Sequence, residues 1–510
     1  MQSVAKVRTE VTARHWLHDK CGNCRNIYLA QIKKHNRAGA QLHAIISTPT
    51  KQQLLDVAQR LDQERKTGKI RGPLHGVPII VKDAFATVPS LGMPTTVGSY
   101  ALIDSRPKKN AAIIDVLIQN GLIILGKTNL TEFCGFKGTG GWSAVEGMCQ
   151  SPYILGGFKK GEKRRGETAP GGSSTGSAVG VAAGFCPISL GTETSGSLTS
   201  PASRAALQAL KLTPGSVSME GVWEVASTYD TAGAMAKSVL DLALVSDMLL
   251  RTTRGGCSKV SLTKSIRSKW QGLSVGFVDI EKWRLPLEAR DPDPGYDEQS
   301  FADYQRAIQM IQEHGGRVVH PVHITPPEEY IVDSEGGNVD DLMDNIMRSQ
   351  ARDGCKKYLS SLEYSKVNDL KDIINFNQAN AAIEFDDMFC PNQNGLEKAL
   401  EATMSAEDLE KNLQICRQWA ATKGVDKIIE ECNVDVIVGP CDSFFAGLGV
   451  GANYPLASIP FGVVKSSGRP YGLHVIARAY EGKIISFMGA WEATWPARKI
   501  PDLDAVAGSL

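Results

Sequence analysis

Residues 170–203, PGGSSTGSAVGVAAGFCPISLGTETSGSLTSPAS, contain two turns rich in glycine and hydroxyl side chains, at 171–177 and 191–197, with a small apolar segment between them. Glycine permits positive φ angles and close approach of the backbone, and successive N–H groups in such turns form a site for anions. This stretch carries too few charged side chains for a solvated linker. We therefore expect buried backbone that positions hydroxyl groups, one of which can act as a nucleophile while N–H groups hold an oxyanion.

Upstream, the segment HGVPIIVKD at 75–83 predicts a buried strand that ends at Lys82. An apolar, β-branched run buried on both faces is typical of a parallel or mixed sheet. A lysine at the end of such a strand is desolvated, which lowers its pKa. A helix over 110–120 and a strand over 121–130 follow, so this part of the chain reads as a strand–helix–strand unit. A second unit is predicted from a strand at 272–280, a helix at 297–316 and a strand at 317–322.

Three segments together resemble the amidase signature hydrolases. The family pattern is close to GGSSGGSA, then G-T/S-D-T-G-G-S-I-R, then P-A, with an upstream G-V-P-x-x-V-K-D that supplies a lysine; this chain reads GGSSTGSA, GTETSGSLT, PA and GVPIIVKD. The resemblance implies a Ser–Ser–Lys triad of Ser197, Ser173 and Lys82, with a cis peptide bond before the middle serine. The interval of 24 residues between the two serines matches that in the family.

The resemblance also implies a role for each residue. Ser197 is the nucleophile, Ser173 relays its proton and Lys82 is the base, because a serine hydroxyl needs a base in reach and a lysine serves only when it is neutral. Residues 170–203 contain no histidine, and only His75 is near Lys82 in sequence. The oxyanion hole is expected from the backbone N–H groups of Thr194, Ser195, Gly196 and Ser197, and supporting hydrogen bonds from Ser174, Thr192 and Glu193.

The implied fold is α/β, a large mixed β-sheet flanked by helices on both faces, in one domain over 1–510. Within it we expect a helical N-terminal segment at 1–70, where Thr50 or Thr48 caps a helix. We expect variable helices over the core at 324–430, as the source of substrate selectivity. The basic run FKKGEKRRGE at 158–167 is expected to be an exposed loop.

The implied activity is that of a serine amidohydrolase, which cleaves a carboxylic amide to acid and amine or ammonia without a metal or an organic cofactor. Two alternatives stay open: acyl transfer or ester cleavage in a biosynthetic pathway on the same acyl-enzyme, and a catalytically weak or partner-dependent protein, like the A subunit of glutamyl-tRNA amidotransferase. Ser195, Thr199 and Glu193 depart from the family's glycine, arginine and aspartate, which leaves rate and substrate class open.

Two other motifs fit less well. Residues 121–128 (GLIILGKT) match the letters of a phosphate-binding loop, but the four middle residues are themselves an apolar strand. Residues 172–176 match the G-x-S-x-G nucleophile elbow, with Ser174 as nucleophile, but that motif follows a strand and here it follows the basic run.

Composition limits the class further. The chain has 510 residues, a net charge of +1, 42% hydrophobic and 22% charged residues, so no bulk charge favours nucleic acid or an acidic membrane. No apolar run suits a membrane span and the N-terminus lacks a secretory pattern, so we expect a cytoplasmic enzyme with reduced thiols among its eleven cysteines. Cys21 and Cys24 form a lone CxxC, a weak metal signal. The expected partner is a small-molecule amide or ester, and a homodimer is compatible with the sequence.

Overall fold

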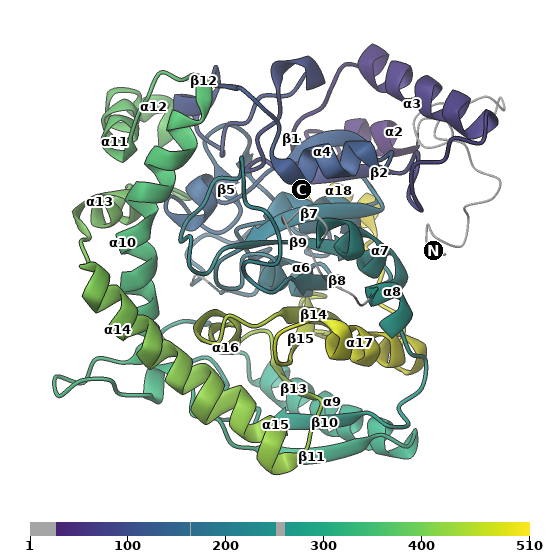
Figure 1. Cartoon of the computed structure of the whole chain (residues 1–510), viewed down its shortest axis with the longest axis vertical. Coiled ribbons are helices and arrows are strands. Elements are labelled where there is room, and N and C mark those ends of the chain that lie inside the picture. The colour runs from purple at the N-terminus through teal and green to yellow at the C-terminus, as the bar shows by residue number, and fades with distance from the viewer. Residues whose placement is uncertain (1–26, 164, 251–260) are drawn as a thin grey trace.

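A computed structural model describes residues 27–163, 165–250 and 261–510. Its core is an eleven-stranded sheet in the order β1-β4-β2-β7-β9-β8-β14-β15-β13-β10-β11 (Figure 1). The strands are β1 (Ile45–Ser47), β2 (Pro78–Lys82), β4 (Ile123–Thr128), β7 (Ile188–Glu193), β8 (Gln208–Lys211), β9 (Thr231–Ala236), β10 (Ser274–Val278), β11 (Arg317–Val322), β13 (Val436–Pro440), β14 (Leu456–Val463) and β15 (Pro470–Ile476).

The sheet is mixed, as expected. β2 pairs in parallel with β4 and β7, and β10 pairs in parallel with β11 and β13, whereas every pair from β7 through β9, β8, β14 and β15 to β13 is antiparallel. The two predicted strand–helix–strand units are both present and supply parallel pairs near opposite ends of the sheet.

Helices cover both faces of the sheet. Side chains alternate along each strand, so both faces carry apolar residues that the helices bury. In β2, Ile79 and Val81 point into one apolar cluster with α4, α7, α9 and α17, and Ile80 points into another with α3, α5 and α6. The helices are α2 (Ile27–His35), α3 (Lys51–Lys66), α4 (Ala112–Gln119), α5 (Thr175–Ala182), α6 (Thr199–Arg204), α7 (Val239–Leu249), α8 (Leu262–Ser265), α9 (Pro294–Glu313), α10 (Val339–Ser360), α11 (Leu370–Ala379), α12 (Ala381–Glu384), α13 (Asn394–Glu401), α14 (Ala406–Arg417), α15 (Asp426–Cys432), α16 (Ala446–Gly451), α17 (Gly482–Thr494) and α18 (Leu503–Gly508).

Residues 339–417 form a run of helices, α10 to α14, that flanks the sheet on the left of Figure 1. Their apolar side chains join two clusters that also include loops next to the sheet. Two short ribbons lie outside the main sheet: β3 (Arg106–Pro107) with β12 (Leu362–Tyr364), and β5 (Trp142–Ser143) with β6 (Gly147–Met148). None of the helices in the described ranges is both long and apolar enough to cross a membrane.

Three local expectations change. Thr50 does cap α3, in a capping box with Gln53, but the segment expected to be helical also contains β1, which extends the sheet by pairing with β4. α5 begins at Thr175, inside the first glycine-rich turn. Gly176 permits this position, because a Cβ there would lie 2.3 Å from a backbone oxygen of the neighbouring chain segment. The basic run is exposed at 159–161, but Gly166 is buried.

Candidate active site

Lys82 is the last residue of β2 and its side chain is fully buried. Its Nζ lies 2.8 Å from Ser173 Oγ and 2.8 Å from Thr192 Oγ1. β2 and β7 are parallel neighbours, so Lys82 and Thr192 meet at the same edge of the sheet. Burial lowers the pKa of Lys82, against the opposing effect of Cys134, Asp230 and Glu193. The neutral amine, the form that can accept a proton, is thereby favoured.

The turn that carries Ser173 lies tightly against its surroundings. The peptide bond between Gly172 and Ser173 is cis. A Cβ at Gly172 would lie 2.5 Å from Thr131 Oγ1, and the N–H of Thr131 donates to the carbonyl oxygen of Ser173 at 3.0 Å. The Ser174 N–H donates to the carbonyl oxygen of Ser197 at 2.8 Å, so a direct backbone hydrogen bond joins the two serine-bearing turns.

Ser197 lies in the turn between β7 and α6 and is partly exposed. Within the described ranges its hydroxyl has no hydrogen-bond partner, and the N–H groups of Ser195, Gly196 and Ser197 donate no hydrogen bond. Gly196 has a φ of 73°, which favours glycine. Backbone donors without an intramolecular acceptor are what an oxyanion hole requires.

Glu193 closes this turn from its end of β7. Its Oε2 accepts hydrogen bonds from the N–H groups of Leu198 and Thr199, each at 2.8 Å, and from Thr199 Oγ1 at 2.9 Å. The two departures from the family pattern, Glu193 and Thr199, therefore contact each other. The longer carboxylate and the short hydroxyl together replace the aspartate and arginine of the pattern.

Two further charged side chains hold the start of the same turn. Thr194 Oγ1 donates to Asp230 Oδ1, and Asp230 Oδ2 accepts from the N–H of Ala226 at 3.0 Å. Lys211 Nζ lies 3.4 Å from the carbonyl oxygen of Thr194. Burial raises the pKa of Asp230 to about 6 and lowers that of Lys211. The motifs in the sequence assign Asp230 no role.

Cys134 was also missed. It lies in a short 3-10 helix (Glu132–Gly135) with a positive φ, and its thiol is next to Lys82 and Thr192. Burial raises its pKa, so the neutral thiol is favoured. No motif in the sequence points to this cysteine, because the loop that carries it reaches Lys82 only through the tertiary fold.

The other candidates from the sequence are Ser174, the apparent phosphate-binding loop and the pair Cys21 and Cys24. Ser174 is buried and donates to the Thr192 carbonyl oxygen at 3.0 Å, and it follows a loop rather than the strand that a nucleophile elbow requires. Residues 123–128 of the apparent phosphate-binding loop are strand β4. Cys21 and Cys24 lie outside the described residues. Across the ranges that the structure describes, no group of three or more metal-ligating side chains is suitably placed to hold an ion.

Known proteins resemble this chain over most of its length. Residues 26–448 match the family model described as Amidase. The chain is 29% identical to a protein of Arabidopsis thaliana named as a probable amidase, over 93% of this chain and 87% of the relative. It is 28% identical to the A subunit of the glutamyl-tRNA(Gln) amidotransferase of Thermoanaerobacter pseudethanolicus, over 91% of each chain.

Among solved structures, the peptide amidase of Stenotrophomonas maltophilia aligns with a TM-score of 0.79 at 28% identity, over 94% of each chain. The fold and the matched motifs thus define an amidohydrolase that acts on C–N bonds other than peptide bonds. The chain belongs to the amidase family, as the resemblance in its sequence implied.

Proposed function

We propose that this protein hydrolyses a carboxylic amide to an acid and an amine or ammonia through an acyl-enzyme on Ser197. The observation that carries the proposal is the fully buried Lys82 amine 2.8 Å from the hydroxyl of Ser173, in a turn joined by a backbone hydrogen bond to the one that carries Ser197. Burial favours the neutral amine that a general base must have.

The proposed reaction begins as Ser197 Oγ attacks the amide carbonyl carbon. The Ser197 proton passes to Ser173, whose own proton passes to Lys82. The N–H groups of Ser195, Gly196 and Ser197, with that of Thr194, stabilise the tetrahedral oxyanion; removing one such donor costs about 3–4 kcal/mol in well-studied enzymes. Collapse breaks the C–N bond, and the amine leaves with the proton returned through Ser173. Water then attacks the ester by the same route and releases the acid.

Labelling with a fluorophosphonate tests the proposal. A single adduct mapped to Ser197 by peptide mass supports it and leads to a screen of amides and esters, including the peptide amides suggested by the name of the solved relative. An adduct on Ser174 would instead indicate a nucleophile elbow. A folded protein without any adduct would contradict the activated nucleophile.

A second candidate is a protein that is active only within a complex, favoured by the match to the A subunit of the amidotransferase over 91% of the chain. Turnover of simple amides by the purified chain alone would argue against it. Acyl transfer on the same acyl-enzyme is distinguished by its product: hydroxylamine added to the assay gives a hydroxamate in place of the acid if an amine competes with water.

The proposed setting is a reducing one, such as the cytoplasm. It is supported by the free thiols of the eight cysteines that lie in the described ranges. Several of them are buried, including Cys149, Cys186 and Cys441. A monomer or homodimer that needs no other protein is the assembly we propose, and size-exclusion chromatography with light scattering tests it.

A further inference from the structure

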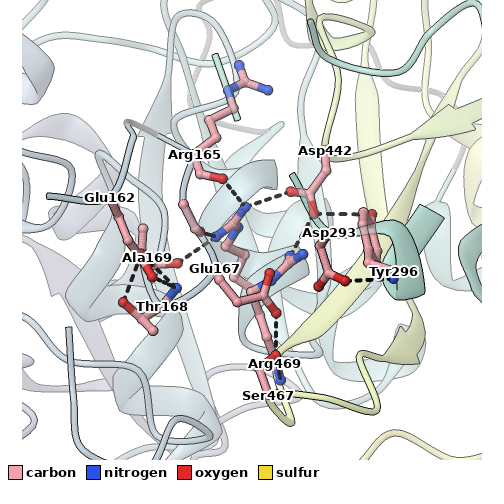
Figure 2. Close-up of polar contacts among 12 residues, drawn as sticks. Glu162, Arg165, Glu167, Thr168, Ala169, Asp293, Tyr296, Asp442, Ser467 and Arg469 are labelled. Carbon is pink, nitrogen blue, oxygen red and sulfur yellow. Dashed lines mark hydrogen bonds and ion pairs between the residues drawn. The ribbon is translucent and has the colours of Figure 1, made fainter. Parts of the chain in front are cut away.

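Arg204 ends α6, the helix that begins two residues after Ser197, and its side chain is only 6% exposed. Its guanidinium turns back to the loop at 165–169, which leads into the turn with Ser173. It donates to the backbone carbonyl oxygens of Gly166, Ala169 at 2.9 Å and Arg165 at 3.3 Å (Figure 2). One side chain thus binds three carbonyls at 165–169, two of which belong to the basic run 158–167 that the sequence predicts to be an exposed loop.

The guanidinium is itself held by the sheet. Asp442 follows β13, and its carboxylate accepts from Arg204 Nη2 at 3.0 Å and from Arg469 Nη1 at 2.6 Å (Figure 2). Tyr296 donates to the same carboxylate at 3.3 Å. Burial raises the pKa of Asp442, but the two arginines outweigh it and hold that pKa below its usual range. Asp442 is therefore ionised, and charge-assisted hydrogen bonds of this kind are stronger than neutral ones.

The loop is also bound through its own side chains. Glu167 accepts from Ser467 Oγ, and its Oε2 lies 3.4 Å from Arg469 Nε. Thr168 donates from its N–H and its hydroxyl to Glu162, each at 2.8 Å. With the hydrogen bonds of Arg204, these contacts place 165–169 against the end of α6 and the residues just before β15.

The N-terminal half of α6 packs against Gly171, which lies between 165–169 and Ser173. A Cβ at Gly171 would lie 3.0 Å from Pro201 Cα, so the approach to Ser173 packs directly on the first turn of the helix. α6 therefore follows Ser197 at its N-terminal end and binds the segment that precedes Ser173 at its C-terminal end. A shift of that segment would move Ser173 relative to both Ser197 and Lys82.

We propose that Arg204, held by Asp442, is a positioning residue that sets the turn with Ser173 relative to the turn with Ser197. It acts through the carbonyls of 165–169 and does not touch the reacting atoms. This inference rests on the proposed function, in which both serines take part. A misplacement of about 1 Å in a catalytic group can reduce the rate about 100-fold, so a contact this far from the chemistry can control it.

The test compares three variants. Arg204→Met removes every donor while keeping a long apolar stem, and Arg204→Lys keeps the charge but can reach only part of the carbonyls. Arg290→Met is the matched control: Arg290 has a 14% exposed side chain and borders the same cluster, but its hydrogen bonds within the described residues go to Asp297 and Leu285 and not to 165–169.

Fluorophosphonate labelling of Ser197 gives a maximal rate and a half-saturating concentration for each variant. We expect Arg204→Met to lower the maximal rate roughly 10- to 100-fold with less than a twofold change in the half-saturating concentration. Arg204→Lys should fall between it and the wild type, and Arg290→Met should match the wild type. Amide hydrogen exchange should be faster at 165–173 in Arg204→Met and unchanged there in Arg290→Met.

An Arg204→Met protein that labels within twofold of wild type, or loses no more than Arg290→Met, would overturn the inference, as would unchanged exchange at 165–173. If Arg204→Met does not fold, Arg204→Lys and Asp442→Asn decide by the same measurements. A wild-type protein that is not labelled would refute the proposed function, and the exchange comparison would then decide by itself whether Arg204 holds the loop.

Discussion

Replacing Thr199 with valine should slow the enzyme although Thr199 does not touch the reacting atoms. Valine keeps the shape and removes the hydroxyl that donates to Glu193 Oε2 at 2.9 Å. A hydrogen bond to a charged group contributes about 1.5–3 kcal/mol. If that energy positions the turn with Ser197 in the transition state, its loss lowers the labelling or turnover rate roughly 10- to 150-fold.

The companion change is Glu193→Ala, which removes the acceptor for two backbone N–H groups and the Thr199 hydroxyl. Each buried donor left without a partner costs about 1–3 kcal/mol, so this variant should lose more activity and some stability. In that background the valine change should cost less than twofold, because the hydroxyl has already lost its acceptor. The two effects are therefore not additive, as expected for residues in contact.

The assay is the rate of fluorophosphonate labelling at Ser197, with the thermal unfolding midpoint measured on the same samples. Thr199→Ser is the control, because it keeps the hydroxyl and should stay close to wild type. The reasoning is refuted if Thr199→Val labels within twofold of wild type, or if it costs the same factor with and without Glu193.

Three further predictions follow from other contacts. Ser197→Ala and Lys82→Met should each abolish labelling and turnover with the far-UV spectrum unchanged, since members of a triad fail together; activity retained in both would end the proposed mechanism. The pKa of Asp230 is raised from 3.8 to about 6 in the folded protein, so its contribution to stability is present below pH 4 and is lost as pH rises through 6. Relative to Asp230→Asn, the wild type should lose about 3 kcal/mol over that interval in urea unfolding, and parallel pH curves would contradict this. Gly176→Ala should destabilise the fold by more than about 3 kcal/mol or prevent folding, because its Cβ would lie 2.3 Å from a backbone oxygen. Gly295→Ala is the control: its nearest contact is at 3.5 Å, so it should be neutral or mildly stabilising. Resistance to protease measures both effects.

Much of the fold could be predicted from local pattern. The strand predicted at 317–322 coincides with β11, and the expected helix at 110–120 contains α4 (Ala112–Gln119). Thr50 caps α3 as its position before an apolar periodic run suggested. These features depend on side chains a few residues apart, so a short window of sequence contains the information.

Only part of the candidate site could be predicted, because only some of its residues lie in a recognisable segment of sequence. Lys82 and Ser173 could be paired because each lies in a recognisable segment, and the structure brings them within 2.8 Å. Cys134 and Asp230 could not be placed, because their loops reach the site only through packing. Glu193 and Thr199 are two separate departures in the sequence, and only the structure shows that they contact each other.

The sequence by itself determined the two strand–helix–strand units, because apolar periodicity expresses local backbone preferences. It also indicated the family, through the resemblance of its glycine- and serine-rich motifs and its GVPIIVKD segment to the family pattern. The tertiary structure alone decided the order of eleven strands, the entry of β1 into the sheet and the binding of loop 165–169 by Arg204. Asp442 lies 238 positions from Arg204 in the chain, and Arg469 lies a further 27 along. Such partners are chosen by burial and by the satisfaction of charged groups in the folded core, which no local pattern encodes.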